Sequence, residues 1–237
     1  CFAAGFDQFT PLRGDVGVAT LPDAAPYRLS SPQFTQRTLI ARDPAQIQRF
    51  DSGHYDMITA NESGPDAGRY LFIPFETNQA GIQRFDLRTQ TVVTLWASPV
   101  AAPALASYVA FDASFWTPWG SLLTAEEAWP RRSGAPSHYG RLLEVVNPLA
   151  APADIKLMHR NILPRVAHEG LAFDAKRNMY FIDERYRGHI FRYTSVQPNA
   201  KDGDAFFAEG QSFVLRVGDG QVPEATGAAS WIPLTDV

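Results

Sequence analysis

The sequence has a single cysteine among its 237 residues, and that cysteine is residue 1. One cysteine excludes a disulfide within the chain and a cysteine-based zinc cluster built by one chain. No apolar run approaches the roughly 20 residues that a membrane-spanning helix needs. The net charge of −4 and the pI near 5.7 provide no basic face of the kind that nucleic acid requires, so we expect no nucleic-acid partner.

Common catalytic sequence patterns are absent as well. The chain has no Gly-x-Ser-x-Gly elbow, no Walker loop, no Gly-x-Gly-x-x-Gly after a strand and no His-Glu-x-x-His. No long stretch shows clean helical periodicity, and 18 prolines and 17 glycines divide the chain with turns. Hydrophobic residues make up 45% of the chain and aromatics 12%, which is enough for a packed core. These features predict an all-β protein.

A short apolar strand that ends in a carboxylate occurs three times. The three segments are Arg69–Glu76, Gly120–Glu127 and Asn178–Glu184, and their final glutamates lie 51 and then 57 residues apart. Each segment belongs to a unit in which we expect four short strands. A period of about 50 residues with four strands per unit is typical of a β-propeller blade. We therefore predict a β-propeller of four-stranded blades.

The predicted blades occupy residues 55–237, and residues 1–54 form a separate N-terminal segment. A fourth and poorer copy of the unit is predicted from Gln211–Val217 followed by Ser230–Leu234. Three clear copies do not close a ring. Either Phe9–Phe50 supplies the missing strands, or the propeller is incomplete here and the chain is a fragment of a longer one.

The repeated carboxylates predict a metal site, because equivalent residues of several blades converge on the central channel of a propeller. A carboxylate at the end of a buried strand also needs a cation or hydrogen-bond donors. In the pairs Glu126-Glu127 and Asp183-Glu184, neighbouring side chains point to opposite faces, so the register with Glu76 selects Glu127 and Glu184. The alternative is that these acids cap strand ends or pair with arginines. The candidate ligands are Glu76, Glu127, Glu169, Glu184 and His168, followed by Glu126 and Asp183.

The nature of the metal follows from the ligand atoms. Several carboxylates suit Ca²⁺, Mn²⁺ or Mg²⁺, and an added imidazole brings iron or zinc within range. Arg185 and Arg187 are candidates for binding an anionic substrate such as phosphate, although surface arginines are the commoner explanation. Cys1 is a candidate lipid attachment site, because processed bacterial lipoproteins begin with an acylated cysteine. The alternative is that Cys1 is simply where the visible fragment starts.

Several segments resemble the PhoX-type alkaline phosphatases and their uncharacterised relatives over roughly residues 55–237. The resemblance implies a β-propeller, exported from the cytoplasm, with a central cluster of iron and calcium ions that hydrolyses phosphomonoesters. Carried over position by position, it makes metal ligands of Glu76, Glu127, Glu169 and Glu184. The segments that carry the resemblance are Tyr70–Glu76, Thr117–Glu127, Arg165–Gly170, Tyr180–Glu184, Gly188–Tyr193 and Trp231–Leu234.

One departure from the family concerns the metal directly. The phosphatases have cysteine where this chain has Ala125, so an iron–thiolate bond is impossible and calcium is the metal we expect. The acidic segment that follows the tryptophan strand in the family is also absent from these 237 residues. A resemblance of this kind establishes fold better than function.

We therefore expect an exported metal-binding β-propeller of the periplasm or cell envelope that is weakly active or non-catalytic. It would serve as a structural or binding subunit, tethered to the membrane through Cys1 or held in a larger envelope complex. The alternative is a metal-dependent phosphomonoester hydrolase acting on a phosphorylated small molecule. A sugar-lactone-type propeller hydrolase would also use channel carboxylates, but the chain lacks that resemblance.

Overall fold

The computed structural model describes residues 35–39, 54–101, 105–128, 138–185, 187–222 and 225–235. The chain divides into two compact units, residues 1–46 and residues 47–237. The fold described here is that of the second unit. Cys1 and almost all of the predicted N-terminal segment lie outside the described residues. Within those residues, no helix is long and apolar enough to cross a membrane.

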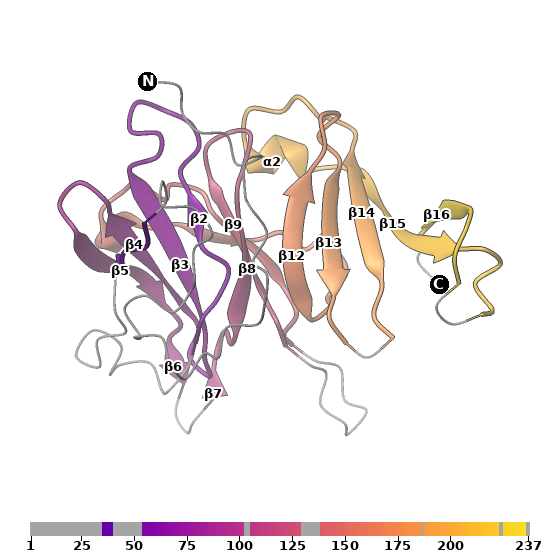
Figure 1. Cartoon of the computed structure of the whole chain (residues 1–237), viewed down its shortest axis with the longest axis horizontal. Coiled ribbons are helices and arrows are strands. Elements are labelled where there is room, and N and C mark those ends of the chain that lie inside the picture. The colour runs from indigo at the N-terminus through magenta and orange to yellow at the C-terminus, as the bar shows by residue number, and fades with distance from the viewer. Residues whose placement is uncertain are drawn as a thin grey trace. The chain divides into compact units, whose positions relative to one another are not determined.

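Three antiparallel sheets make up most of the second unit (Figure 1). The first sheet contains β1 (His54–Tyr55), β2 (Thr59–Ala60), β3 (Tyr70–Glu76), β4 (Gly81–Asp86) and β5 (Thr91–Ala97). The second contains β8 (Phe111–Trp116), β9 (Leu122–Glu126), β10 (Leu142–Val145) and β11 (Leu157–His159). The third contains β12 (His168–Phe173), β13 (Met179–Asp183), β14 (Ile190–Ser195), β15 (Gly210–Val217) and β16 (Ala229–Pro233).

Little else in the described residues is regular. A two-stranded ribbon, β6 (Val100–Ala101) and β7 (Leu105–Ala106), links the first and second sheets, and the helical pieces are η2 (Pro152–Asp154) and α2 (Gly203–Phe206). The predicted all-β class is confirmed. Closure of the sheets into a propeller stays a prediction.

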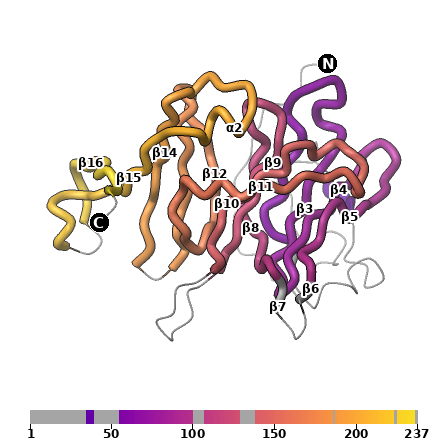
Figure 2. The backbone as a smooth tube through the Cα atoms, turned by 180° about the vertical axis from the view of Figure 1, so that it is seen from behind, coloured from indigo at the N-terminus to yellow at the C-terminus, as the bar shows by residue number. Residues whose placement is uncertain are grey.

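The second sheet lies between the other two. Its first strand, β8, packs against β3 on one side and β12 on the other, and the three sheets follow one another in this order in both views (Figures 1 and 2). Side chains along a strand alternate between faces. Leu122 therefore packs against the first sheet, in the cluster with Phe72 and Ile82, whereas Leu123 packs against the third, in the cluster with Phe181. This two-sided burial explains why every residue of β9 is buried.

The prediction of a fourth repeat was wrong. Its two segments form β15 and β16, the fourth and fifth strands of the third sheet, where Val214 pairs with Phe191 of β14 and with Ile232 of β16. The connection before β15 explains this result. Phe206 and Phe207, in and just after α2, pack on Tyr193 of β14, and the Tyr193 hydroxyl donates to the Phe206 carbonyl at 3.2 Å. The chain is thereby held beside β14 and continues the same sheet.

The third sheet has one open face. In the second sheet Ala125 of β9 pairs with Leu142 of β10, and both are buried beneath the third sheet. The equivalent pair in the third sheet is Ile182 and Ile190, which remain 40% and 43% exposed. The face that covers its neighbour in the first two sheets is therefore uncovered in the third.

Candidate metal centre

The first group of acidic side chains comprises Glu76, Glu127 and Glu184, called here the strand-end glutamates. Glu76 is the last residue of β3, and the other two come directly after β9 and β13. One backbone segment holds two of them, because Glu127 forms a β-bridge with Ala167 and the Glu184 amide donates to the Ala167 carbonyl at 2.9 Å. Burial, then the nearby carboxyl groups of Glu184 and Glu76, raise the pKa of Glu127 to about 9. The structure thus brings together the three glutamates that the repeat selects.

The second group comprises Asp56, Asp112 and Glu169, called here the inner acids, because they lie on or between the first strands of the three sheets. Asp112 is only 1% exposed, and its Oδ1 atom has no hydrogen-bond partner among the described residues. Burial, then the nearby carboxyl groups of Glu169 and Asp56, raise its pKa to about 10. Carboxylates that face one another in this way favour bound protons or a bound cation.

A β-bulge positions each inner acid. Between the pairs Phe111–Glu126 and Ser114–Thr124, β8 advances three residues while β9 advances two, and Asp112 lies in this interval. Glu169 lies in the matching interval of β12, between the pairs His168–Asp183 and Leu171–Phe181. A bulge interrupts the regular alternation and re-aims a side chain.

The first sheet has the same irregularity. Tyr55 of β1 pairs with Phe75, and pairing resumes at Thr59 of β2 with Phe72, so that four residues on one side oppose three on the other. Asp56 lies in this interval. All three inner acids therefore occupy one extra residue inserted at the same point of each sheet.

Both groups lie at the same end of the sheets, because the start of each first strand pairs with the end of the second strand. Among the ion pairs of the described residues, none involves any of the six carboxylates. Six acidic groups therefore gather there without a basic side chain to neutralise them. Hard cations such as Ca²⁺ prefer oxygen ligands of this kind.

The six acids fit a divalent cation in chemistry, and the unpartnered Asp112 oxygen is the observation that supports this fit. In the described part of the chain, however, no three His, Cys, Asp or Glu side chains are already arranged as a coordination shell. The carboxylates would have to draw closer around an ion. The raised pKa values of Glu127 and Asp112 show that each group lacks a compensating positive charge.

Two predicted alternative ligands are already engaged by the chain itself. The buried Glu126 carboxylate forms an ion pair with Arg141 at 2.7 Å and also accepts from the Val109 amide at 3.2 Å. The Asp183 Oδ1 atom accepts from the amides of Ala167 at 3.2 Å and Arg185 at 3.3 Å. We assign both residues structural roles.

His168 is fully buried, and its ring packs tilted against Phe181 with centroids 5.3 Å apart. Neither imidazole nitrogen has a hydrogen-bond partner among the described residues. Burial lowers the pKa of His168 to about 3, against a smaller opposing effect of the Gly140 backbone. The imidazole is therefore neutral at physiological pH, which is the form that can bind a metal. Its role as a ligand stays a prediction.

Ala125 lies in the core between the second and third sheets, at a position with no exposed surface. Its methyl group has no atom that could ligate a metal. The nearby Thr117-Pro-Trp-Gly120 segment is structural: the Trp119 indole donates to the buried Glu144 carboxylate at 2.8 Å. Arg160 also pairs with Glu144 at 2.6 Å, so this acid is satisfied too.

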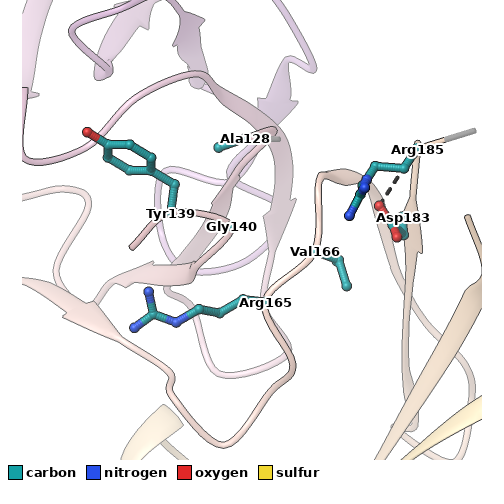
Figure 3. Close-up of a pocket in the computed structure, with 7 residues that line it drawn as sticks. All are labelled: Ala128, Tyr139, Gly140, Arg165, Val166, Asp183 and Arg185. Atoms are coloured by element: carbon teal, nitrogen blue, oxygen red, sulfur yellow. Dashed lines mark hydrogen bonds between the residues drawn. The ribbon is translucent and has the colours of Figure 1, made fainter. Parts of the chain in front are cut away.

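The two predicted anion-binding arginines differ in position. Arg185 lines a cavity of about 190 Å³ (Figure 3), whereas Arg187 is exposed and is not one of its described lining residues. Arg187 has a positive φ of 66°, in a tight turn beside Gly188. The cavity is lined by Ala128, Tyr139, Gly140, Arg165, Val166, Asp183 and Arg185.

Sequence reasoning missed Asp56 and Asp112. A signal for them was present, because Tyr55-Asp56, Phe111-Asp112 and His168-Glu169 are each an aromatic residue followed by an acid. These pairs are separated by 56 and 57 residues, which is the period of the strand-end glutamates in the later repeats.

Comparison with known proteins supports the resemblance seen in the sequence. A family model described as alkaline phosphatase PhoX matches residues 113–237, which is more than half of the chain and includes Glu127, Glu169 and Glu184. Comparison with curated proteins and with solved structures gave no significant match. The match to the family model nevertheless establishes the relationship, and the chain belongs to the PhoX alkaline phosphatase family.

Proposed function

We propose that this chain is a calcium-binding β-propeller protein of the PhoX family in which the strand-end glutamates and the inner acids hold the metal. The observation that carries the proposal is the convergence of equivalent carboxylates from three successive sheets, with the pKa of Glu127 and Asp112 raised by their acidic neighbours. A cation bound between these groups would replace their mutual repulsion with attraction.

Calcium is the metal that this donor set favours. It accepts six to eight oxygen ligands in flexible geometry, and carboxylates are its commonest protein ligands. Ala125 supplies no thiolate, so the chain lacks the soft ligand that would favour iron. His168 could add one nitrogen donor, with iron or zinc as the outcome to be tested against calcium.

The repeated sheets support the propeller. The first strands β3, β8 and β12 pack in succession, and each sheet carries its acids at the same end. The open face around Ile182 and Ile190 is where a further sheet would pack in such a ring.

The role that we propose is structural or ligand-binding, with weak or no hydrolysis. Calcium activates water poorly compared with iron or zinc, and the family cysteine is replaced by Ala125. We also propose an extracytoplasmic location, in the periplasm or cell envelope, with Cys1 as a lipid attachment site or the chain as a subunit of an envelope complex. These last points follow from the family resemblance.

A metal-dependent phosphomonoester hydrolase is the second candidate, and membership of a phosphatase family favours it. A bound ion would supply positive charge to the phosphate oxygens and lower the pKa of a water molecule. The carboxylates of this chain would hold the ion in place. The substrate would be a phosphorylated small molecule.

Calorimetric titration of calcium into chelator-stripped protein tests the proposal, with a phosphomonoester assay on the same samples. We expect saturable calcium binding and little hydrolysis with calcium, iron or zinc. The absence of saturable calcium binding would refute the metal site. Vigorous hydrolysis that Glu127→Gln abolishes would establish the second candidate instead.

A further inference from the structure

The cavity between the second and third sheets contains more cationic donors than its own residues use. Its walls come from the segment after β9, the segment before β10, the segment before β12 and the end of β13. Ala128 follows Glu127, and Asp183 and Arg185 flank Glu184. The cavity therefore lies next to the strand-end glutamates without including them.

Two of the walls are held close together by backbone contacts. The Val166 amide donates to the Gly140 carbonyl at 3.2 Å. Gly140 has a positive φ of 78°, and a side chain there would approach the Val166 carbonyl to 2.7 Å. Only glycine permits this approach without strain. The cavity is therefore built by the fold and is not a chance gap between loops.

Charge inside the cavity favours an anion. The one lining carboxylate, Asp183, already accepts two backbone amides. Arg165 donates one of its guanidinium hydrogens to the His138 carbonyl, which leaves its other donors available. For Arg185, the only hydrogen bond printed by the geometry of the described residues is the one from its backbone amide to Asp183.

The arrangement of the side chains is visible in Figure 3. Arg185 lies with Val166 and Asp183 on one side of the cavity, and Tyr139 and Arg165 lie on the other. A guanidinium group offers paired donors that match the oxygens of a phosphate or carboxylate. The volume of about 190 Å³ is below the range of roughly 300–1,000 Å³ typical of sites for larger ligands, so it suits a small ion with a few waters.

A buried polar group beside the cavity also lacks a partner. His168 is the cross-strand partner of the lining residue Asp183, and the Gly140 backbone lies near its ring. Neither of its nitrogens is hydrogen-bonded within the described structure. An anion or an ordered water in the cavity could satisfy the ring N–H.

We propose that this cavity is a binding site for a small oxyanion, in which Arg185 supplies the main charge and paired hydrogen bonds, with Arg165 opposite it. The site does not require a metal and is separate from the carboxylate centre. The shared chemistry is a phosphate-like group, which could come from the free ion or from a small phosphomonoester.

Calorimetric titration of calcium-free protein in chelator tests this site independently of the calcium proposal. The probes are inorganic phosphate, glycerol phosphate and sulfate. We expect saturable binding of phosphate, and an affinity at least about tenfold lower in Arg185→Gln, because a charge-assisted bidentate contact is lost. Tighter binding of glycerol phosphate than of phosphate would identify the monoester as the ligand, and the reverse order would identify the free ion.

Arg216→Gln is the matched control, because Arg216 is an exposed arginine of β15 outside the cavity, and its affinity should equal that of the unmodified protein. Arg185→Lys keeps the charge but loses the planar fork, and should bind with intermediate affinity. Unchanged thermal unfolding of these variants checks their folding. Failure of the unmodified protein to bind phosphate in chelator, or equal affinity in Arg185→Gln, would overturn the proposal, whatever the result for calcium.

Discussion

Replacing Glu127 with glutamine should have effects of opposite sign in the absence and presence of calcium. Without metal, Glu127 lies beside Glu76 and Glu184, and its pKa is raised from 4.5 to about 9. The folded state therefore holds a proton that the unfolded chain releases above pH 4.5. Stability from this group is complete below that pH and is lost as pH rises through about 9. Glutamine is neutral at every pH, so Glu127→Gln should be at least as stable as the unmodified protein in chelator at pH 8.

Calcium should reverse this order. At a hundredfold excess over its dissociation constant, a ligand stabilises the folded state by about 2.7 kcal/mol. For a domain of this size, each kcal/mol raises Tm by roughly 2–4 °C, so the expected rise is about 5–11 °C. Glu127→Gln removes one charged ligand, so it should gain less and should melt below the unmodified protein in calcium.

The assay is thermal unfolding at pH 8, in chelator and in calcium, for the unmodified protein, Glu127→Gln and Glu62→Gln. Glu62 is an exposed glutamate outside both acidic groups, so its variant should follow the unmodified protein in both conditions. An equal loss of Tm in chelator and calcium would show that Glu127 is an ordinary structural residue. A Tm that calcium does not raise would refute the reasoning altogether.

Three further outcomes are expected. Metal-free protein should lose stability as pH rises from about 4 through about 9 and 10, because Asp112 and Glu127 both hold protons in the folded state; calcium should displace those protons, so its affinity should rise with pH and its binding should release protons, measurable by calorimetry in two buffers of different ionisation enthalpy. Arg141→Met should lower the free energy of unfolding by about 3 kcal/mol in urea, equally with and without calcium, because it leaves the buried Glu126 carboxylate unpaired; an effect present only in calcium would place Glu126 in the metal site. Phosphomonoester hydrolysis by the calcium-loaded protein should be weak and should change little in Glu127→Gln, as measured by phosphate release.

The strand-end glutamates could be predicted because a repeat transfers information between its copies. Glu76, Glu127 and Glu184 end equivalent strands, and the period-2 alternation separates Glu127 from Glu126. The structure places Glu126 against Arg141 and brings Glu127 to the other glutamates. A local rule was sufficient here, since the strands in question are regular.

The inner acids could not be found by that rule, because they lie where regularity fails. Asp112 and Glu169 occupy β-bulges, in which strand alternation no longer indicates the direction of a side chain. Only a comparison of aromatic–acid pairs across the repeats would have identified them. The distant pairing that places β15 and β16 in the third sheet was likewise invisible, because it depends on Phe206 and Phe207 packing against Tyr193.

The cavity beside the carboxylates also depends on tertiary structure. Arg165 and Arg185 are 20 residues apart in sequence, and they line one space because β12 and β13 pair between them. The sequence selected Arg185 together with Arg187, and only the fold separates the two.

Anomalous diffraction from crystals grown with calcium tests the metal centre most directly. The account predicts a calcium peak bounded by the strand-end glutamates or by the inner acids, with carboxylate oxygens at about 2.3–2.6 Å from the ion. The same crystals should show the side chains of that group drawn together around it. A calcium-saturated crystal with well-ordered carboxylates and no peak near either group would contradict the account.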